Sequence, residues 1–261
     1  MSTHKKQVFR QQHNKQTIEV WEENGLRWLA FGDKTVQTTI DLSDPGRLAS
    51  ASCQALLSAL LFIPTPRRVL LLGTGGGSIA RYLYHHCPTI LGDAIEQSQT
   101  VAEVAKQFFE FPDDPEKWQL RIADAKEYIG NAERTYDLSI LDISAGGSHT
   151  PAWITKPQFL SECRQCLSPG GALAINLIPE DEKSFITALW NIRQAFDQKT
   201  VCLSVPDHKN IVVIAFHGLP EFHTIDTLKQ RTTELTMQWN LTFDAFLGRM
   251  AQENPAGSGI F

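Results

Sequence analysis

In the first third of the chain, a wholly apolar run leads directly into a cluster of glycines. This pattern occurs in few folds and therefore constrains the structure of the chain more than any other feature of the sequence. Val69–Leu72 is followed by Gly73-Thr74-Gly75-Gly76-Gly77 and then by Ser78, where a helical pattern begins. Short continuous apolar runs are typical of strands buried on both faces of a parallel sheet. Glycines allow a sharp turn and close approach of a ligand, and the helix behind them offers free N–H groups. The pattern predicts a strand–turn–helix unit that binds a nucleotide; a tight turn without a ligand is the alternative.

Downstream of the glycines, apolar strand-like runs alternate with amphipathic helix-like runs. Predicted strands cover 90–96, 120–123, 136–142, 172–177, 199–205 and 211–216, and predicted helices cover 78–86, 98–109, 125–131, 157–167 and 182–196. This rhythm is typical of a doubly wound α/β sheet of the Rossmann type.

The segments before and after this α/β region show different sequence patterns. Residues 15–40 alternate β-branched or aromatic with polar residues, and turn signals at Glu23-Asn24-Gly25 and Gly32-Asp33-Lys34 divide them into two or three antiparallel strands. A helix is expected through residue 61, with Ser43 or Asp44 as N-cap and Pro45 in its first turn. Residues 224–250 are mainly helical in pattern. We therefore predict an N-terminal β-unit (1–44), a nucleotide-binding domain (45–218) and a C-terminal helical tail packed on the core (219–261).

Composition and charge argue against several classes of protein. The net charge is −5 and the pI is near 5.9, so a broad nucleic-acid surface is not expected. The longest apolar stretch, Ala55–Ile63, is far shorter than a membrane span. The odd number of cysteines, five, and the lack of an apolar segment behind the basic N-terminus indicate free thiols in a cytoplasmic protein. Cys163 and Cys166 have CxxC spacing but lie on a predicted amphipathic helix, so we assign them to the core and predict no metal site.

Acidic residues end the predicted strands that follow the glycine turn. Glu96, 23 residues after Gly73, can accept the ribose hydroxyls of a nucleotide, or it is a solvated residue at a strand end. Asp124 can accept from the exocyclic amine of adenine, or it caps the helix that begins at Ala125, and both roles can coexist. Asp142 ends the next strand, where a transferred group and its acceptor would meet, so it is the candidate base or orienting residue. In the loop beyond it, His149 and Trp153 either face an acceptor or belong to ordinary loop structure.

These elements occur in an order that resembles the spermidine synthase family, the polyamine aminopropyltransferases, whose fold is the class I AdoMet-methyltransferase-like Rossmann fold. The resemblance covers roughly residues 37–177 and rests on LLLGTGGGSIAR, EQSQTVAEVAKQFF, RIADAKEYI, YDLSILD and FLSECRQCLSPGGALAIN. It implies S-adenosylmethionine (AdoMet) or its decarboxylated form as cofactor, a small-molecule acceptor and a possible homodimer. It also implies site residues: Gly73, Gly75 and Gly77 around the sulfonium side of the nucleotide, Glu96 on the ribose, Asp124 and Ala125 on the adenine, Gln37 reaching the nucleoside from the β-unit, and Asp142 as the catalytic aspartate.

The chain departs from the family pattern around the expected acceptor. Gly76 stands where the family has an aspartate that binds the amine of the decarboxylated donor. Ala145 and Gly146 replace a second aspartate and a proline, and residues 45–54 contain no tyrosine. Specific binding of a polyamine needs several placed carboxylates. We therefore expect a transferase that moves a methyl or aminopropyl group to an amine or hydroxyl, with methyl slightly favoured. Spermidine synthase activity proper, a catalytically silent nucleotide-binding protein and an NAD-dependent oxidoreductase are the alternatives.

Overall fold

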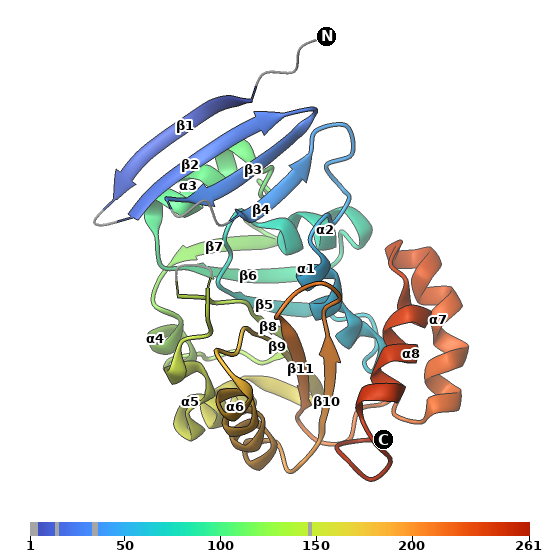
Figure 1. The fold of residues 1–261 in the computed structure, drawn as a ribbon. Coiled ribbons are helices and arrows are strands. Elements are labelled where there is room, and N and C mark those ends of the chain that lie inside the picture. The colour runs from blue at the N-terminus through green and yellow to red at the C-terminus, as the bar shows by residue number, and fades with distance from the viewer. Residues whose placement is uncertain (1–4, 14–15, 33–35, 146–147) are drawn as a thin grey trace.

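The computed structural model places a seven-stranded mixed sheet at the centre of the molecule (Figure 1). It describes all residues except 1–4, 14–15, 33–35 and 146–147. The strand order is β10-β11-β9-β8-β5-β6-β7. Five neighbouring strands are parallel, and β11 and β10 are antiparallel additions at one edge. The strands are β5 (Arg68–Leu72), β6 (Leu91–Glu96), β7 (Trp118–Ile122), β8 (Tyr136–Leu141), β9 (Leu167–Leu177), β10 (Thr200–Ser204) and β11 (Ile211–Phe216). The predicted α/β fold class is confirmed.

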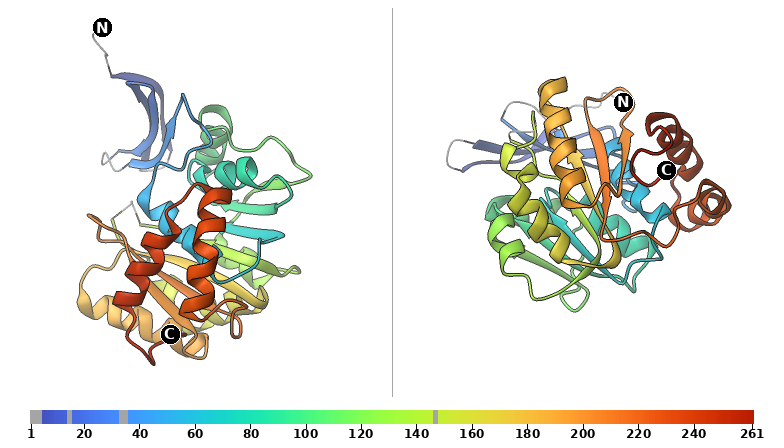
Figure 2. Two further views of the ribbon diagram at one scale, coloured as in Figure 1. Left: turned by 90° about the vertical axis from the view of Figure 1, so that its right-hand side faces the viewer. Right: turned by 90° about the horizontal axis from the view of Figure 1, so that it is seen from below.

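Helices cover both faces of this sheet because its strands present apolar side chains alternately to each face. Along β5, Val69 and Leu71 belong to one buried cluster and Leu70 and Leu72 to the other. The first cluster includes residues of α1 (Ala51–Leu56), the 3₁₀ helix η1 (Leu57–Leu61), α2 (Ser78–His86), α7 (Ile225–Trp239) and α8 (Phe243–Glu253). The second includes residues of α4 (Ala125–Gly130), α5 (Pro157–Gln165) and α6 (Glu182–Ala195). Figure 2 shows the paired helices α7 and α8 on the outside of the molecule, where they contact η1 and, through α8, β10.

A second, four-stranded antiparallel sheet packs on α3 (Gln99–Phe108). Its strands are β1 (Lys6–His13), β2 (Gln16–Glu23), β3 (Leu26–Phe31) and β4 (Val36–Asp41). The prediction of two or three strands missed β1, because this edge strand is polar along most of its length and carries no apolar alternation. The turn predicted at Asn24-Gly25 lies between β2 and β3, whereas Asp33 and Lys34 of the second predicted turn lie outside the described residues.

The helix expected from Pro45 begins later, at Ala51, with Ser50 as its N-cap. Asp41 instead closes a local turn by accepting from the backbone N–H and the hydroxyl of Ser43. The carbonyl of Pro45, which would accept a helical bond, accepts from the buried guanidinium of Arg81 at 2.7 Å. The predicted N-caps Ser43 and Asp44 are therefore wrong, because a long-range contact holds this segment as a loop.

Strand β9 also starts earlier than expected. The Pro169-Gly-Gly segment, which falls between the predicted helix 157–167 and the predicted strand 172–177, lies inside β9, where the pairing with β8 shifts register between Tyr136 and Leu138. Gly171 fits this irregularity because a Cβ there would come within 3.1 Å of the carbonyl oxygens of Tyr136 and Asp137. In the part of the chain that the structure describes, no helix is long and apolar enough to cross a membrane.

Candidate functional site

Four predicted site residues lie at the carboxyl ends of neighbouring parallel strands or within two residues of them. Gly73 follows β5, Glu96 ends β6, Asp124 lies two residues after β7, and Asp142 follows β8. These strands lie side by side in the order β8-β5-β6-β7, and the chain crosses from β5 to β6 on one side and reaches β8 on the other. Ligands of open α/β sheets bind at such a change of direction. The topology therefore brings the four residues to one edge of the sheet.

The glycine turn between β5 and α2 is close-packed. Gly73 has φ +84°, and a Cβ there would overlap the carbonyl oxygen of Asp142. Gly77 has φ +78°, and a Cβ there would lie 2.7 Å from the Phe111 ring. Both positions require glycine for backbone reasons alone. Gly73 and Gly75 line the cavities described below, whereas Gly77 is not among their lining residues and packs on Phe111.

The first cavity, of about 290 Å³, lies between β6, the start of α4 and the small sheet; we call it the nucleoside cavity, after the ligand expected from the sequence. Glu96 lies in its wall with both carboxylate oxygens held by the backbone: Gly75 donates to Oε2 at 3.1 Å and Ser98 donates to Oε1 at 2.9 Å. Burial raises the pKa of Glu96 although these N–H groups act in the opposite direction. Carboxylate oxygens can accept more than one hydrogen bond, so Glu96 can still receive hydroxyl donors from the cavity.

Asp124 and Ala125 lie on the far wall of the nucleoside cavity. Asp124 is the N-cap of α4, and its Oδ1 accepts from the backbone N–H of Lys126 at 2.7 Å. Trp153, also in this wall, lies 4.4 Å from the Lys126 ammonium, measured to its ring centroid. With Phe31 and Ile95 these side chains form a partly apolar wall that suits a planar base. The capping hypothesis for Asp124 is correct, and Trp153 belongs to this cavity and not to the second one.

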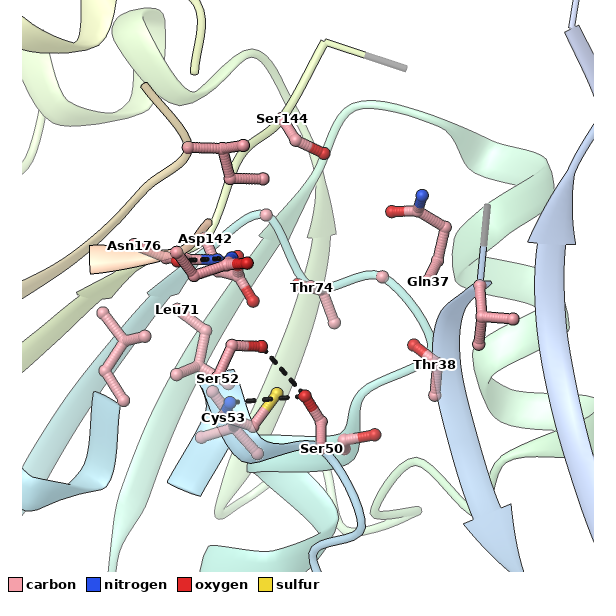
Figure 3. Close-up of a pocket in the computed structure, with 18 of the residues that line it drawn as sticks. Gln37, Thr38, Ser50, Ser52, Cys53, Leu71, Thr74, Asp142, Ser144 and Asn176 are labelled. Carbon is pink, nitrogen blue, oxygen red and sulfur yellow. Dashed lines mark hydrogen bonds between the residues drawn. The ribbon is translucent and has the colours of Figure 1, made fainter. Parts of the chain in front are cut away.

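The second cavity, of about 300 Å³, shares Asp142 with the first; we call it the acceptor cavity, after the substrate expected there from the sequence. Asp142 and Asn176 occupy one side of it in Figure 3, where Asn176 donates to Asp142 Oδ1 at 2.8 Å. Asn210 in turn donates to Asn176 Oδ1 at 2.9 Å. Burial raises the pKa of Asp142, and the hydrogen bond from Asn176 partly offsets that rise.

The rest of the acceptor cavity wall combines hydroxyl, amide and thiol groups with apolar side chains. The apolar residues are Val36, Leu71, Ile79, Ile140 and Ile178. Figure 3 shows Gln37 and Thr38 of β4 across from Asp142, with Ser50, Ser52 and Cys53 below Asp142 in the view. The hydroxyls of Ser50 and Ser52 are 2.9 Å apart. Burial and the nearby Asp142 carboxylate raise the pKa of Cys53 to about 12, so its thiol is protonated and unreactive.

The position of Gly76 is filled from the small sheet. Thr38 accepts from the Gly76 N–H at 2.9 Å, and a Cβ on Gly76 would lie 2.5 Å from the Thr38 methyl carbon. A side chain at residue 76 therefore cannot enter unless Thr38 moves. Ala145 forms an isolated bridge with His149, outside both cavities, and Gly146 lies outside the described residues.

Several residues of the site were not identified from the sequence. The acceptor cavity adds Thr38, Ser50, Asn176 and Asn210 to the predicted set. Asn210 precedes β11, and because β11 runs antiparallel to β9 its start lies at the carboxyl edge where Asp142 follows β8. The signal that could have found Asn176 is its position as a polar residue inside the apolar run 172–178.

Comparisons with known proteins agree with this geometry. The profile of the spermine/spermidine synthase domain matches residues 56–218, more than half of the chain. A polyamine aminopropyltransferase from Chromobacterium violaceum is 30% identical over 244 residues, which cover 93% of this chain and 92% of that protein. A spermidine synthase solved with the transition-state analogue AdoDATO superposes with a TM-score of 0.73 at 19% identity, covering 94% of this chain and 85% of that one. Human methyltransferase-like protein 13, solved with SAH, has a TM-score of 0.56 at 23% identity and covers 79% of this chain and 91% of that one.

Proposed function

The chain belongs to the spermine/spermidine synthase family, and from that premise we propose that it transfers the alkyl group of a sulfonium nucleoside to a small nucleophilic acceptor. One observation carries the proposal: the two cavities share Gln37, Gly73, Gly75, Asp142 and Ser144. A nucleoside in the first cavity would thus present its 5′ substituent to the second cavity beside Asp142. That is where a donor and an acceptor must meet for direct transfer.

The nucleoside cavity supplies the groups that an adenosine needs. We assign the ribose hydroxyls to Glu96, whose oxygens are already oriented by two backbone N–H groups. Adenine would lie beside Asp124 and Ala125, and Gln37 would reach the nucleoside from β4. Gly73 and Gly75 would line the path of the sulfonium, with Gly77 supporting the turn from behind.

The chemistry asked of the protein is modest because a sulfonium is already an activated leaving group. The lone pair of the acceptor attacks the carbon on sulfur, the new bond to carbon forms, and the C–S pair returns to sulfur as a neutral thioether. The proton lost by an acceptor amine passes to Asp142. The raised pKa of this carboxyl makes it a better proton acceptor than an exposed aspartate. The surrounding cavity aligns the reactants and limits access of water.

Aminopropyl transfer is the reaction we propose first. The curated relative that matches over more than nine tenths of both chains is an aminopropyltransferase, so the slight preference for methyl transfer drawn from the sequence has no support in the comparisons. With decarboxylated AdoMet as donor, this reaction releases methylthioadenosine.

Methyl transfer is the second candidate, and one observation favours it. Thr38 fills the space beside Gly76, so no carboxylate at that position can bind the donor's amine or repel a donor carboxylate. Intact AdoMet would then be accepted, and S-adenosylhomocysteine would be released.

The test uses both donors. Each is titrated while the thermal midpoint is followed, and the released nucleoside is then identified by mass after incubation with a mixture of amines and amino alcohols. A donor at 100 times its Kd stabilises the fold by about 2.7 kcal/mol, equivalent to a rise of roughly 5–10 °C for a chain of this size. Methylthioadenosine identifies aminopropyl transfer and S-adenosylhomocysteine identifies methyl transfer.

Asp142→Asn is the control for activity. A transferase loses turnover in this variant while it still binds nucleoside, whereas a catalytically silent nucleotide-binding protein releases neither product before or after the change. A thermal shift with NADH but with neither sulfonium donor would contradict the proposal.

A further inference from the structure

We propose that the acceptor is a compact molecule with one amino group at one end and a neutral hydrogen-bonding group at the other, as in an amino alcohol. This inference rests on the proposed function and specifies the substrate class of the same site. It is carried by the polar groups that line the described part of the acceptor cavity.

Asp142 is the anionic end of that cavity, and only part of its carboxylate is free to bind. Oδ1 is occupied by the amide of Asn176, which is itself held by Asn210. The two hydrogen bonds cross from the end of β8 through β9 to the start of β11, so they fix the carboxylate from the side of the sheet. As a single negative charge, this carboxylate can balance one ammonium.

The wall away from Asp142 is built for neutral partners. Ser50, Ser52, Thr38 and Ser144 offer hydroxyls and Gln37 offers an amide, while Leu71, Ile79 and Ile140 add apolar surface that suits an alkyl chain. Hydroxyls and amides both donate and accept, so they match a hydroxyl or amide on the acceptor. A second ammonium placed against them would lose its hydration without gaining a counter-charge, because Asp142 is the one carboxylate among the described lining residues.

Two other titratable groups line the acceptor cavity. Cys53 of α1 is protonated and neutral, and His208 is exposed in the turn between β10 and β11. Neither supplies the negative charge that a diamine needs, and a protonated His208 would repel one. Glu96 and Asp124 belong to the nucleoside cavity, where the proposed donor binds.

The experiment compares three acceptors of equal chain length: 4-aminobutan-1-ol, 1,4-diaminobutane and 1-aminobutane. Each is tested with the full chain and the donor that gives product, and kcat/KM is measured. We expect the amino alcohol to exceed both others by about tenfold, because a site that hydrogen-bonds a substrate group discriminates against an analogue that lacks it or replaces it by an unpaired charge. A higher kcat/KM for 1,4-diaminobutane would overturn the inference while leaving the proposed function intact.

A pair of matched variants tests the same point from the side of the protein. Ser144→Asp adds a second carboxylate to the wall, and Ser144→Asn adds a neutral side chain of the same shape. We expect Ser144→Asp to raise the ratio of diamine to amino alcohol use by about tenfold and Ser144→Asn to leave that ratio unchanged. Equal ratios in the two variants would contradict the inference. Donor-induced thermal shifts are recorded for both, so a loss of donor binding is recognised as failure of the proposed function and not of the acceptor class.

Discussion

The position and protonation of Asp142 depend on the residues that contact it as well as on its place in the sequence. Its position after β8 was predictable from the strand pattern, because a polar residue that ends a buried parallel strand lies at the carboxyl edge. Its partners Asn176 and Asn210 were not predictable, because they come from strands whose neighbours in the sheet are set by tertiary packing. The same limit applies to Thr38, whose contact with Gly76 joins two sheets.

Removal of the Asn176 amide tests its role as a positioning residue. The hydrogen bond from Asn176 lowers the pKa of Asp142, so Asn176→Ala raises it further. Because Asp142 must be deprotonated to accept a proton, the acidic limb of the pH profile of kcat/KM moves to higher pH. We expect kcat to fall about tenfold, because one hydrogen bond to a charged group contributes roughly the free energy that corresponds to a tenfold change in rate. The KM for the donor should change little.

Asn131→Ala is the matched control, since Asn131 is exposed beyond α4 and lies outside both cavities. Asn176→Gln keeps an amide and should recover part of the activity. An unmoved acidic limb in Asn176→Ala would exclude Asn176 as a determinant of the protonation of Asp142.

Glu96→Gln tests the nucleoside cavity. Both oxygens of Glu96 accept hydrogen bonds from backbone N–H groups. In Glu96→Gln the side-chain NH₂ replaces one of these oxygens, so that one backbone N–H points at another donor and loses its acceptor. We expect a loss of about 1–3 kcal/mol in the free energy of unfolding and the loss of most of the donor-induced thermal shift. Chemical denaturation and donor titration measure the two effects. Glu103→Gln, on the exposed face of α3, is the control and should change neither the free energy of unfolding nor the donor-induced thermal shift. If Glu96→Gln keeps full donor affinity, Glu96 does not bind the nucleoside.

Among the elements, those with strong local signals could be predicted from the sequence and those fixed by distant contacts could not. Strand β11 and helix α2 have the predicted bounds because periodicity and flanking turns both define them. Helix α1 starts six residues after Pro45 because Arg81 takes the Pro45 carbonyl, and β9 begins at Leu167, before Pro169-Gly-Gly, because Tyr136 of β8 pairs with Leu167. Arg81 and β8 are far from these segments in the sequence, so their contacts cannot be predicted from local sequence patterns.

The contact between β4 and the glycine turn gives a prediction at this scale. Gly76→Asp alone should lower the free energy of unfolding by about 1–3 kcal/mol, because its Cβ meets the Thr38 side chain. The double variant Gly76→Asp, Thr38→Gly removes that overlap and should regain part of the loss, as measured against Thr38→Gly alone. The new carboxylate should also increase the preference for decarboxylated over intact AdoMet. Equal stability of Gly76→Asp and the unchanged chain would mean that Thr38 does not restrict residue 76.

At the scale of the whole molecule, the candidate site depends on both sheets at once. The small sheet contributes Gln37 and Thr38 through β4, whereas the large sheet contributes Gly73, Glu96 and Asp142. The small sheet also packs on α3, which begins three residues after Glu96 in the chain. A donor that contacts both sheets therefore stabilises their association, since any ligand that binds the native arrangement favours it over more open ones.

Hydrogen exchange can detect this coupling without an acceptor. We expect saturating donor to slow amide exchange in β4 and in residues 73–78, because Gln37, Gly73 and Gly75 line the nucleoside cavity and Gly76 donates its N–H to Thr38. The helices α7 and α8 serve as an internal control: they contact η1 and β10 and line neither cavity, so their exchange should change little below the level of global unfolding. Protection confined to residues 73–78, with β4 unchanged, would show that the donor binds the large sheet alone. In that case Gln37 would have no part in nucleoside binding, and the small sheet would contribute packing only.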